Sequence, residues 1–109
     1  PVVVLINGST FSAGELCTEI MKQLPNVTAV GDTTGGGSAG GTSEPPNART
    51  EFYLPSGKMI DIGTVDLRRY DGLPWEWLGV PPDIRVVQTE ADIKQGRDKQ
   101  LEYAIKFLK

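Results

Sequence analysis

The chain has 109 residues, a formal net charge of −3 and no histidine. This length allows one domain at most, and the scattered lysines and arginines argue against a nucleic-acid-binding protein. With no histidine and a single cysteine, an internal disulfide is excluded and a zinc or other transition-metal site is not expected. No apolar stretch approaches the roughly 20 residues that span a bilayer.

The first part of the chain predicts a parallel strand–helix–strand unit. Val2 to Ile6 is a continuous apolar run, typical of a strand that is buried on both faces. From residue 13 to residue 24 apolar side chains recur with helical spacing, and Pro25 ends that helix. Val27 to Val30 predicts a second strand, which is expected to lie parallel to the first.

The remaining elements are predicted from turn residues and from changes in the hydrophobic period. In chain order they are a Gly/Ser/Thr/Pro-rich loop at 33–46, a β-hairpin formed by 51–54 and 58–62, an irregular segment at 65–76, a rigid turn at 79–83, a strand at 84–87 and a helix at 91–108. The loop at 33–46 is too polar to form core and is expected to be a mobile loop beside a cleft. Asp83 is expected to cap the turn before the last strand.

Ser12, at the junction between the first strand and the first helix, is the main candidate for a catalytic residue. A serine at the end of a rigid strand, with the next N–H at a helix N-terminus, occupies a favourable position for a nucleophile. The segment Ser12-Ala13-Gly14-Glu15 also fits a capping box, in which Ser12 caps the helix and Glu15 reaches back to the Ser12 N–H. The two interpretations are compatible, and both stay open.

The other candidate motifs are weaker. Gly35 to Gly40 matches G-x-G-x-x-G, but residues 42–46 cannot start the helix that would hold a dinucleotide, so no cofactor is expected. On sequence alone, Glu76 is a solvent-facing residue of an irregular segment. Lys22 on the polar face of the helix and Lys58 at the hairpin tip offer no obvious catalytic base.

Four segments, taken together, resemble the C-terminal processing protease and tricorn family of serine peptidases. They are Val2-Val3-Val4-Leu5-Ile6-Asn7, Ser12-Ala13-Gly14-Glu15, Val30-Gly31-Asp32-Thr33-Thr34-Gly35-Gly36 and Gly79-Val80-Pro81-Pro82-Asp83-Ile84. The resemblance covers nearly the whole chain. It implies an α/β fold, the crotonase/ClpP-like catalytic core of a tail-specific protease, with residues 1–109 forming the C-terminal part of that domain.

The same resemblance implies the roles of individual residues. Ser12 matches the nucleophile of a serine endopeptidase, and the N–H of Ala13 matches one oxyanion-hole donor. The glycines of the following loop, Gly35, Gly36 and Gly37, are expected to bind substrate. No metal or other cofactor is implied.

The branch of the family is indicated by two departures. The processing proteases pair their serine with a lysine and a glutamine, and these positions hold Gly37 and Gly41 here. The tricorn-like branch lacks that lysine and uses a histidine, a supporting serine and a glutamate. Its glutamate matches Glu76, which would orient the histidine or its partner, and its histidine comes from a segment before Pro1.

The chain begins directly before a strand and is therefore expected to be a piece of a longer polypeptide. Without the upstream histidine, it is expected to be nearly inactive alone. Its expected partners are a peptide or protein substrate and the upstream remainder of its own polypeptide. The family often works outside the cytoplasm in bacteria, which favours a periplasmic or extracytoplasmic location.

Two other function classes stay open. One is a catalytically inactive protease-like module that binds a peptide or small apolar ligand, similar to the retinoid-binding repeats of the eye. The other is a crotonase-like enzyme that binds an acyl-CoA through backbone N–H groups and needs no serine at position 12.

Overall fold

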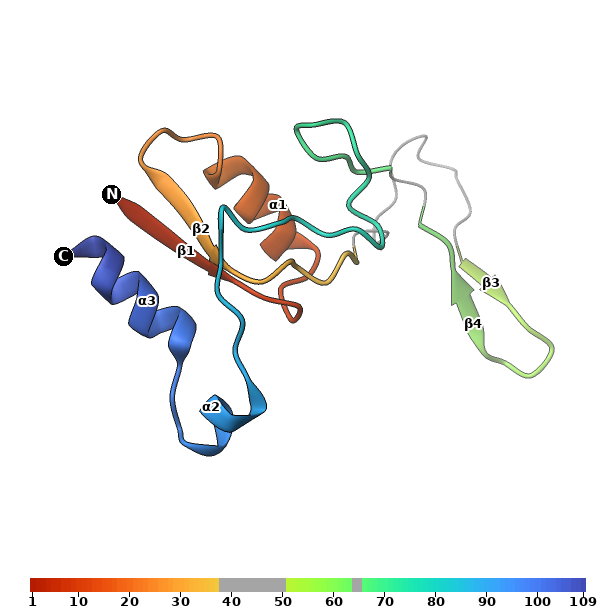
Figure 1. The fold of residues 1–109 in the computed structure, drawn as a ribbon. Coiled ribbons are helices and arrows are strands. Elements are labelled where there is room, and N and C mark those ends of the chain that lie inside the picture. Colours follow the sequence, from red (N-terminus) through yellow and green to blue (C-terminus); the bar gives the residue numbers. More distant parts are fainter. Residues whose placement is uncertain (38–50, 64–65) are drawn as a thin grey trace.

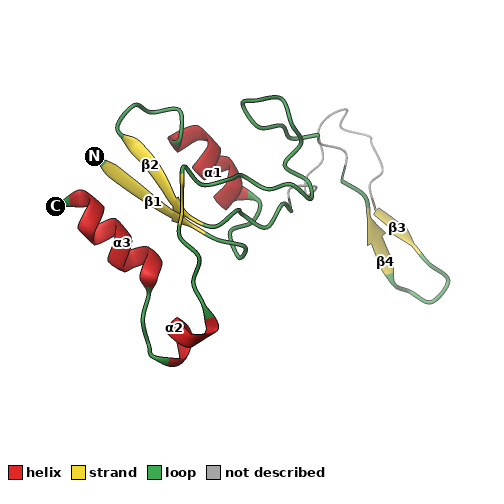
Figure 2. Cartoon of the chain, viewed as in Figure 1, coloured by secondary structure: helices red, strands yellow, loops and turns green. Residues whose placement is uncertain are grey.

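A computed structural model describes residues 1–37, 51–63 and 66–109. The elements are β1 (Val2–Ile6), α1 (Ala13–Met21), β2 (Val27–Gly31), β3 (Glu51–Tyr53), β4 (Met59–Asp61), β5 (Ile84–Arg85), α2 (Glu90–Lys94) and α3 (Lys99–Leu108). They form an α/β fold with a three-stranded sheet ordered β1–β2–β5 and a separate β3–β4 hairpin (Figures 1 and 2).

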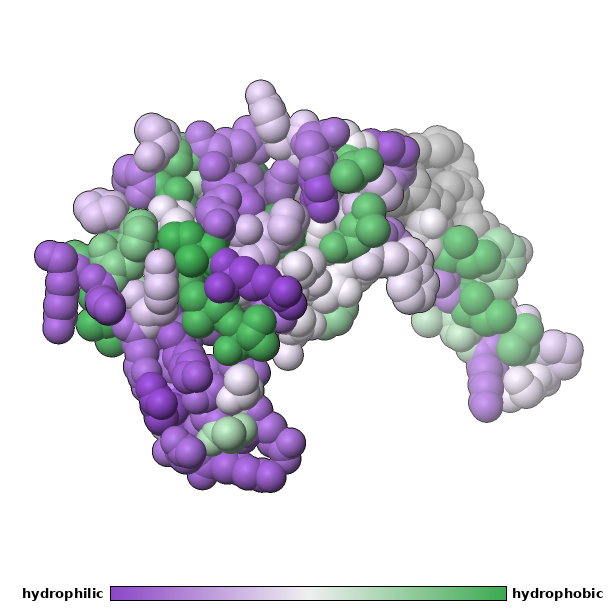
Figure 3. Space-filling model, viewed as in Figure 1, coloured by the Kyte–Doolittle hydropathy of each residue, from purple (hydrophilic) through white to green (hydrophobic). Residues whose placement is uncertain are grey.

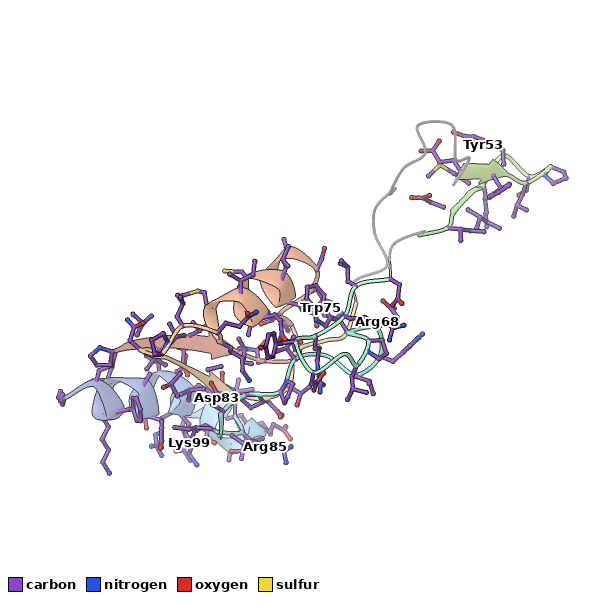
Figure 4. All side chains as sticks on the ribbon, turned by 90° about the horizontal axis from the view of Figure 1, so that it is seen from above. Tyr53, Arg68, Trp75, Asp83, Arg85 and Lys99 are labelled. Atoms are coloured by element: carbon purple, nitrogen blue, oxygen red, sulfur yellow. The ribbon has the colours of Figure 1, made fainter. Side chains whose placement is uncertain are left out.

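The three-stranded sheet is parallel throughout, as the strand–helix–strand pattern predicts. β1 and β2 pair from Val2↔Val27 to Ile6↔Gly31, and β5 pairs with the end of β2. Helix α1 covers one face of the sheet and α3 covers the other (Figures 1 and 4). The core therefore centres on β2, where Ala29 and Val30 are fully buried.

Strand β1 is less buried than its apolar sequence predicts. Val2 and Leu5 are each 39% exposed, and Ile6 is the buried residue of the strand. In the order β1–β2–β5, β1 lies at the edge of the sheet and has a paired neighbour on one side within the described residues. In the part of the chain that the structure describes, its side chains are therefore covered by a neighbouring strand on that side alone, and the prediction of a strand buried on both faces is wrong.

Helix α1 ends three residues earlier than the hydrophobic pattern predicts. After Met21 the chain tightens into turns, in which the Gln23 N–H donates to the Ile20 carbonyl and the Leu24 N–H to the Met21 carbonyl, at 3.2 and 3.0 Å. These short-range bonds satisfy the last carbonyls of the helix and reverse the chain toward β2.

Asp83 joins two strands instead of capping its own turn. Its Oδ2 accepts a hydrogen bond from the Ala29 N–H at 2.7 Å, and its own N–H donates to the Ala29 carbonyl at 2.8 Å. Lys22 Nζ, at the end of α1, lies 3.0 Å from Asp83 Oδ1. The prediction that Asp83 caps its turn is thus wrong. Asp83 instead extends the pairing of β2 with β5, and its ion pair with Lys22 links α1 to these strands.

The C-terminal segment forms two helices, so the prediction of one continuous helix is wrong. Gly96 has φ +67°, in the left-handed region that favours glycine. The Arg97 N–H donates to the Asp92 carbonyl and the Gly96 N–H to the Ile93 carbonyl, both at 2.9 Å, which is the Schellman arrangement that ends α2. Asp98 then caps α3 by accepting the Leu101 N–H at 2.9 Å.

The buried Asp92 carboxylate is expected to make the packing of α2 sensitive to acid. The hydroxyl of Thr89 donates to the Asp92 carboxylate, and this bond, with the Thr89 N–H and Lys99, holds the pKa of Asp92 below its usual value. Because the folded pKa is lowered, the carboxylate stabilises the fold above about pH 4 and loses that effect as the pH falls further. We expect Asp92→Asn to lower the midpoint of urea unfolding at pH 7, and this difference to shrink below about pH 4.

The predicted hairpin is confirmed as β3 and β4, which pair antiparallel around the turn at Gly57. Phe52 of β3 and Ile60 of β4 pair across the hairpin and are both exposed, and Figure 3 shows apolar surface along the hairpin. Figure 1 shows the hairpin standing apart from the three-stranded sheet.

None of the helices in the described part of the chain is long and apolar enough to cross a membrane.

Candidate active site

Ser12 lies in the tight connection from β1 to α1, in a backbone conformation that is rare for serine. Its φ of +51° and ψ of −116° lie outside the regions that residues with a Cβ favour, and its side chain is exposed. The Ser12 N–H donates to the Gly37 carbonyl and to Glu15 Oε2, each at 3.1 Å. Such strain persists only where surrounding contacts enforce it, and it is common at functional sites.

Ala13 is the first residue of α1, and its N–H points out of the helix N-terminus. The first N–H groups of a helix have no intrahelical acceptor. The Ala13 N–H makes no hydrogen bond to any of the residues described in the structure. It is therefore a backbone donor beside the Ser12 hydroxyl, at the positive end of the helix dipole.

Glu15 is fully buried and receives four hydrogen bonds. Oε2 accepts the N–H groups of Ser12 and Gly37 at 3.1 Å each. Oε1 accepts the Gly36 N–H at 2.8 Å and the Thr34 hydroxyl at 2.5 Å. Of these four contacts of Glu15, the capping-box motif predicts the one with the Ser12 N–H. The other three donors come from a segment about 20 residues away and have no local sequence signal.

Thr34 links this carboxylate to a third segment of the chain. Its hydroxyl donates to Glu15 and accepts the Val80 N–H at 2.7 Å, while its own N–H donates to the Val80 carbonyl at 3.1 Å. Thr34 and Gly36 are buried, so the prediction that this loop lies outside the core is wrong for these two residues. Residues 38–46 of the predicted loop lie outside the described residues.

The loop glycines use their N–H groups inside the protein. Gly35 donates to the Thr10 carbonyl at 2.9 Å, and Gly36 and Gly37 donate to Glu15. A Cβ at Gly35 or Gly37 would lie 2.1 or 2.6 Å from the ring of Phe11, which shows how closely that ring covers the loop. Any contact of these glycines with substrate would thus use groups other than their N–H.

Glu76 lies in a turn that packs against the same glycine loop. The Trp77 N–H donates to the Gly36 carbonyl at 2.9 Å, and the Gly79 N–H closes the turn on the Trp75 carbonyl at 2.8 Å. Trp75 is 2% exposed, whereas Glu76 is half-buried, so it is more enclosed than a solvent-facing residue. Figure 4 shows Trp75 beside Arg68 in this segment, well separated from Tyr53 on the hairpin.

The predicted site residues are therefore linked through one backbone framework. Ser12 contacts Gly37, Gly36 contacts the turn that carries Glu76, and Glu15 lies between them. Within residues 1–37, 51–63 and 66–109 there is no cluster of three or more side chains that could hold a metal ion. The geometry is that of a loop and a turn joined by hydrogen bonds beside an exposed serine.

Comparison with known proteins points to one family. Residues 1–86 match the profile of peptidase family S41. A Streptomyces coelicolor protein named as a homologue of tricorn protease is 30% identical over 109 residues, covering 98% of this chain. A solved structure from Parabacteroides merdae, described as a peptidase, is 34% identical with a TM-score of 0.76 over 99% of this chain. The tricorn protease structure is 25% identical, also with a TM-score of 0.76, over 97% of this chain.

These relatives are much longer than the present chain. The chain spans 9% of the Streptomyces protein, 31% of the Parabacteroides structure and 10% of the tricorn protease structure. The similarity therefore concerns one part of each relative.

Proposed function

Because this chain belongs to peptidase family S41, a family of serine peptidases, we propose that Ser12 is the nucleophile of a serine endopeptidase. Residues 1–109 would form the C-terminal part of its catalytic domain, a crotonase/ClpP-like core. The observation that carries the proposal is the strained and exposed Ser12, with the Ala13 N–H beside it at the start of α1. The substrate would be a peptide or protein.

In the proposed reaction, Ser12 Oγ attacks the carbonyl carbon of a peptide bond while a base takes its proton. The tetrahedral oxyanion is stabilised by the Ala13 N–H, and a single donor of this kind contributes about 3–4 kcal/mol to catalysis. Collapse of the intermediate releases the amine with a proton from the base and leaves an acyl-enzyme on Ser12, which water hydrolyses. Assistance by a general base increases the rate by a factor of roughly 10²–10⁴.

In this proposal the base is a histidine, and the chain contains none. We assign it to the upstream remainder of the polypeptide. Glu76 would orient that histidine or its supporting residue, because its turn is docked on the loop that contacts Ser12. Gly37 stands where a lysine base would be needed in the processing proteases, which favours the tricorn-like arrangement. This chain alone would then be nearly inactive.

The direct test is covalent labelling of the full-length parent protein with a fluorophosphonate probe, followed by intact-mass and peptide analysis. We expect one probe adduct, located on Ser12, and no adduct in Ser12→Ala. The rate of labelling should fall in Glu76→Gln. A folded parent without an adduct at Ser12 would rule out the nucleophile and favour a protease-like binding module.

A further inference from the structure

We infer that Glu15 is a positioning residue that holds Ser12 in its reactive conformation by tying the serine, the glycine loop and the turn at Trp75–Val80 to one buried carboxylate. The inference rests on the proposed function of Ser12. It adds to that function a residue that touches neither substrate nor base.

The groups that meet at Glu15 are all hydrogen-bond donors. Three are backbone N–H groups and the fourth is the Thr34 hydroxyl, with two donors on each carboxylate oxygen. A carboxylate only accepts hydrogen bonds and has room for about four, so donors and acceptors match. No basic side chain of the described residues forms an ion pair with Glu15, so its hydrogen-bonding capacity is taken up by the loop and the serine.

The same carboxylate acts directly on the backbone of Ser12. The Ser12 N–H is shared between Glu15 Oε2 and the Gly37 carbonyl, and the Gly37 N–H also reaches Glu15 Oε2. The peptide group between Phe11 and Ser12 is thus held by two acceptors, Glu15 Oε2 and the Gly37 carbonyl. Glu15 also fixes Gly37, because it accepts the Gly37 N–H. This is the local constraint that the φ of +51° requires.

The other capping box of the chain, at the start of α2, shows what a purely structural carboxylate does. Asp92 is also buried and also accepts its cap residue's N–H, from Thr89 at 3.0 Å. Its remaining contacts are local or ionic, with Lys99 Nζ at 3.2 Å. Glu15 instead reaches three groups about 20 residues away. Asp92 is therefore a matched control: a buried capping-box carboxylate that stabilises α2 and its contact with α3 and, among the described residues, has no hydrogen bond to the Ser12 loop.

The experiment compares Glu15→Gln with Asp92→Asn in the full-length parent. In Glu15→Gln, one carboxylate oxygen becomes an NH₂ group that faces two hydrogen-bond donors. The substitution therefore disrupts the hydrogen bonds while the side chain keeps nearly the same size. We expect the rate constant of fluorophosphonate labelling at Ser12, measured well below the unfolding temperature, to fall about 100-fold or more. Asp92→Asn should lower the unfolding temperature and leave the labelling rate unchanged. On a peptide substrate, Glu15→Gln should lower kcat with little change in KM.

A second pair of variants decides the matter if Glu15→Gln does not fold. Thr34→Val removes one donor to Glu15 and the acceptor of the Val80 N–H at nearly constant volume, and it should slow labelling. Thr34→Ser keeps the hydroxyl and should be labelled at the wild-type rate. The inference is overturned if Glu15→Gln or Thr34→Val labels at the wild-type rate, or if Asp92→Asn slows labelling as much. If the wild-type protein is not labelled at Ser12, the proposed function fails instead.

Discussion

Ser12→Gly is expected to make the full-length protein more stable and to abolish its acylation. Serine at φ +51° and ψ −116° carries strain of about 1–3 kcal/mol, which glycine does not have because it lacks a Cβ. Glycine loses about 0.5–1 kcal/mol more conformational entropy on folding, so the net gain is about 1 kcal/mol. Peptidase activity should fall by a factor on the order of 10⁶, as it does when a serine nucleophile is removed.

Ser12→Ala is the matched control for this prediction. Alanine also lacks the hydroxyl but keeps the Cβ, so the same loss of labelling is expected without the gain in stability. The difference in unfolding temperature between Ser12→Gly and Ser12→Ala isolates the backbone strain. Equal or lower stability of Ser12→Gly would contradict a strained conformation at this position.

The elements that could be predicted are those set by local patterns. The apolar run of β1, the helical spacing of α1 and the turn of the hairpin each depend on neighbouring residues, and each element formed where it was expected. α1 and the hairpin strands differ from the prediction in their bounds, and β1 differs in its burial. The split between α2 and α3 also has a local cause, since Gly96 and the cap residue Asp98 end one helix and begin the next. The apolar periodicity across that segment gave no indication of this break.

The polar framework around Ser12 could not be predicted in the same way. A Gly- and Thr-rich segment is ordinarily exposed, because its backbone groups need water or another partner. Here the Glu15 carboxylate supplies that partner and lets Thr34 and Gly36 lie buried. Their pairing depends on how α1 and β2 come together, which no local spacing encodes.

Gly36→Ala is expected to destabilise the protein strongly, because this glycine is where the loop meets the turn that carries Glu76. Gly36 has φ +70°, and a Cβ there would lie 2.9 Å from the Trp77 carbonyl carbon and 3.1 Å from the Trp75 carbonyl oxygen. These are backbone atoms of a turn closed by its own hydrogen bonds, so they cannot move aside as a side-chain tip can. Together with the cost of the left-handed conformation, we expect a loss of about 2–4 kcal/mol in unfolding free energy.

Gly96→Ala provides the control for Gly36→Ala, because it shares the conformation and lacks the crowding. Gly96 has φ +67° and nothing within 4 Å of the position of a Cβ. It should therefore lose only the conformational contribution, about 1–2 kcal/mol, and keep the wild-type rate of labelling at Ser12. Gly36→Ala should also slow labelling, since shifting the loop moves two of the donors away from Glu15. Urea unfolding and probe labelling of both variants measure this, and equal losses of stability would show that the loop–turn contact is not tight.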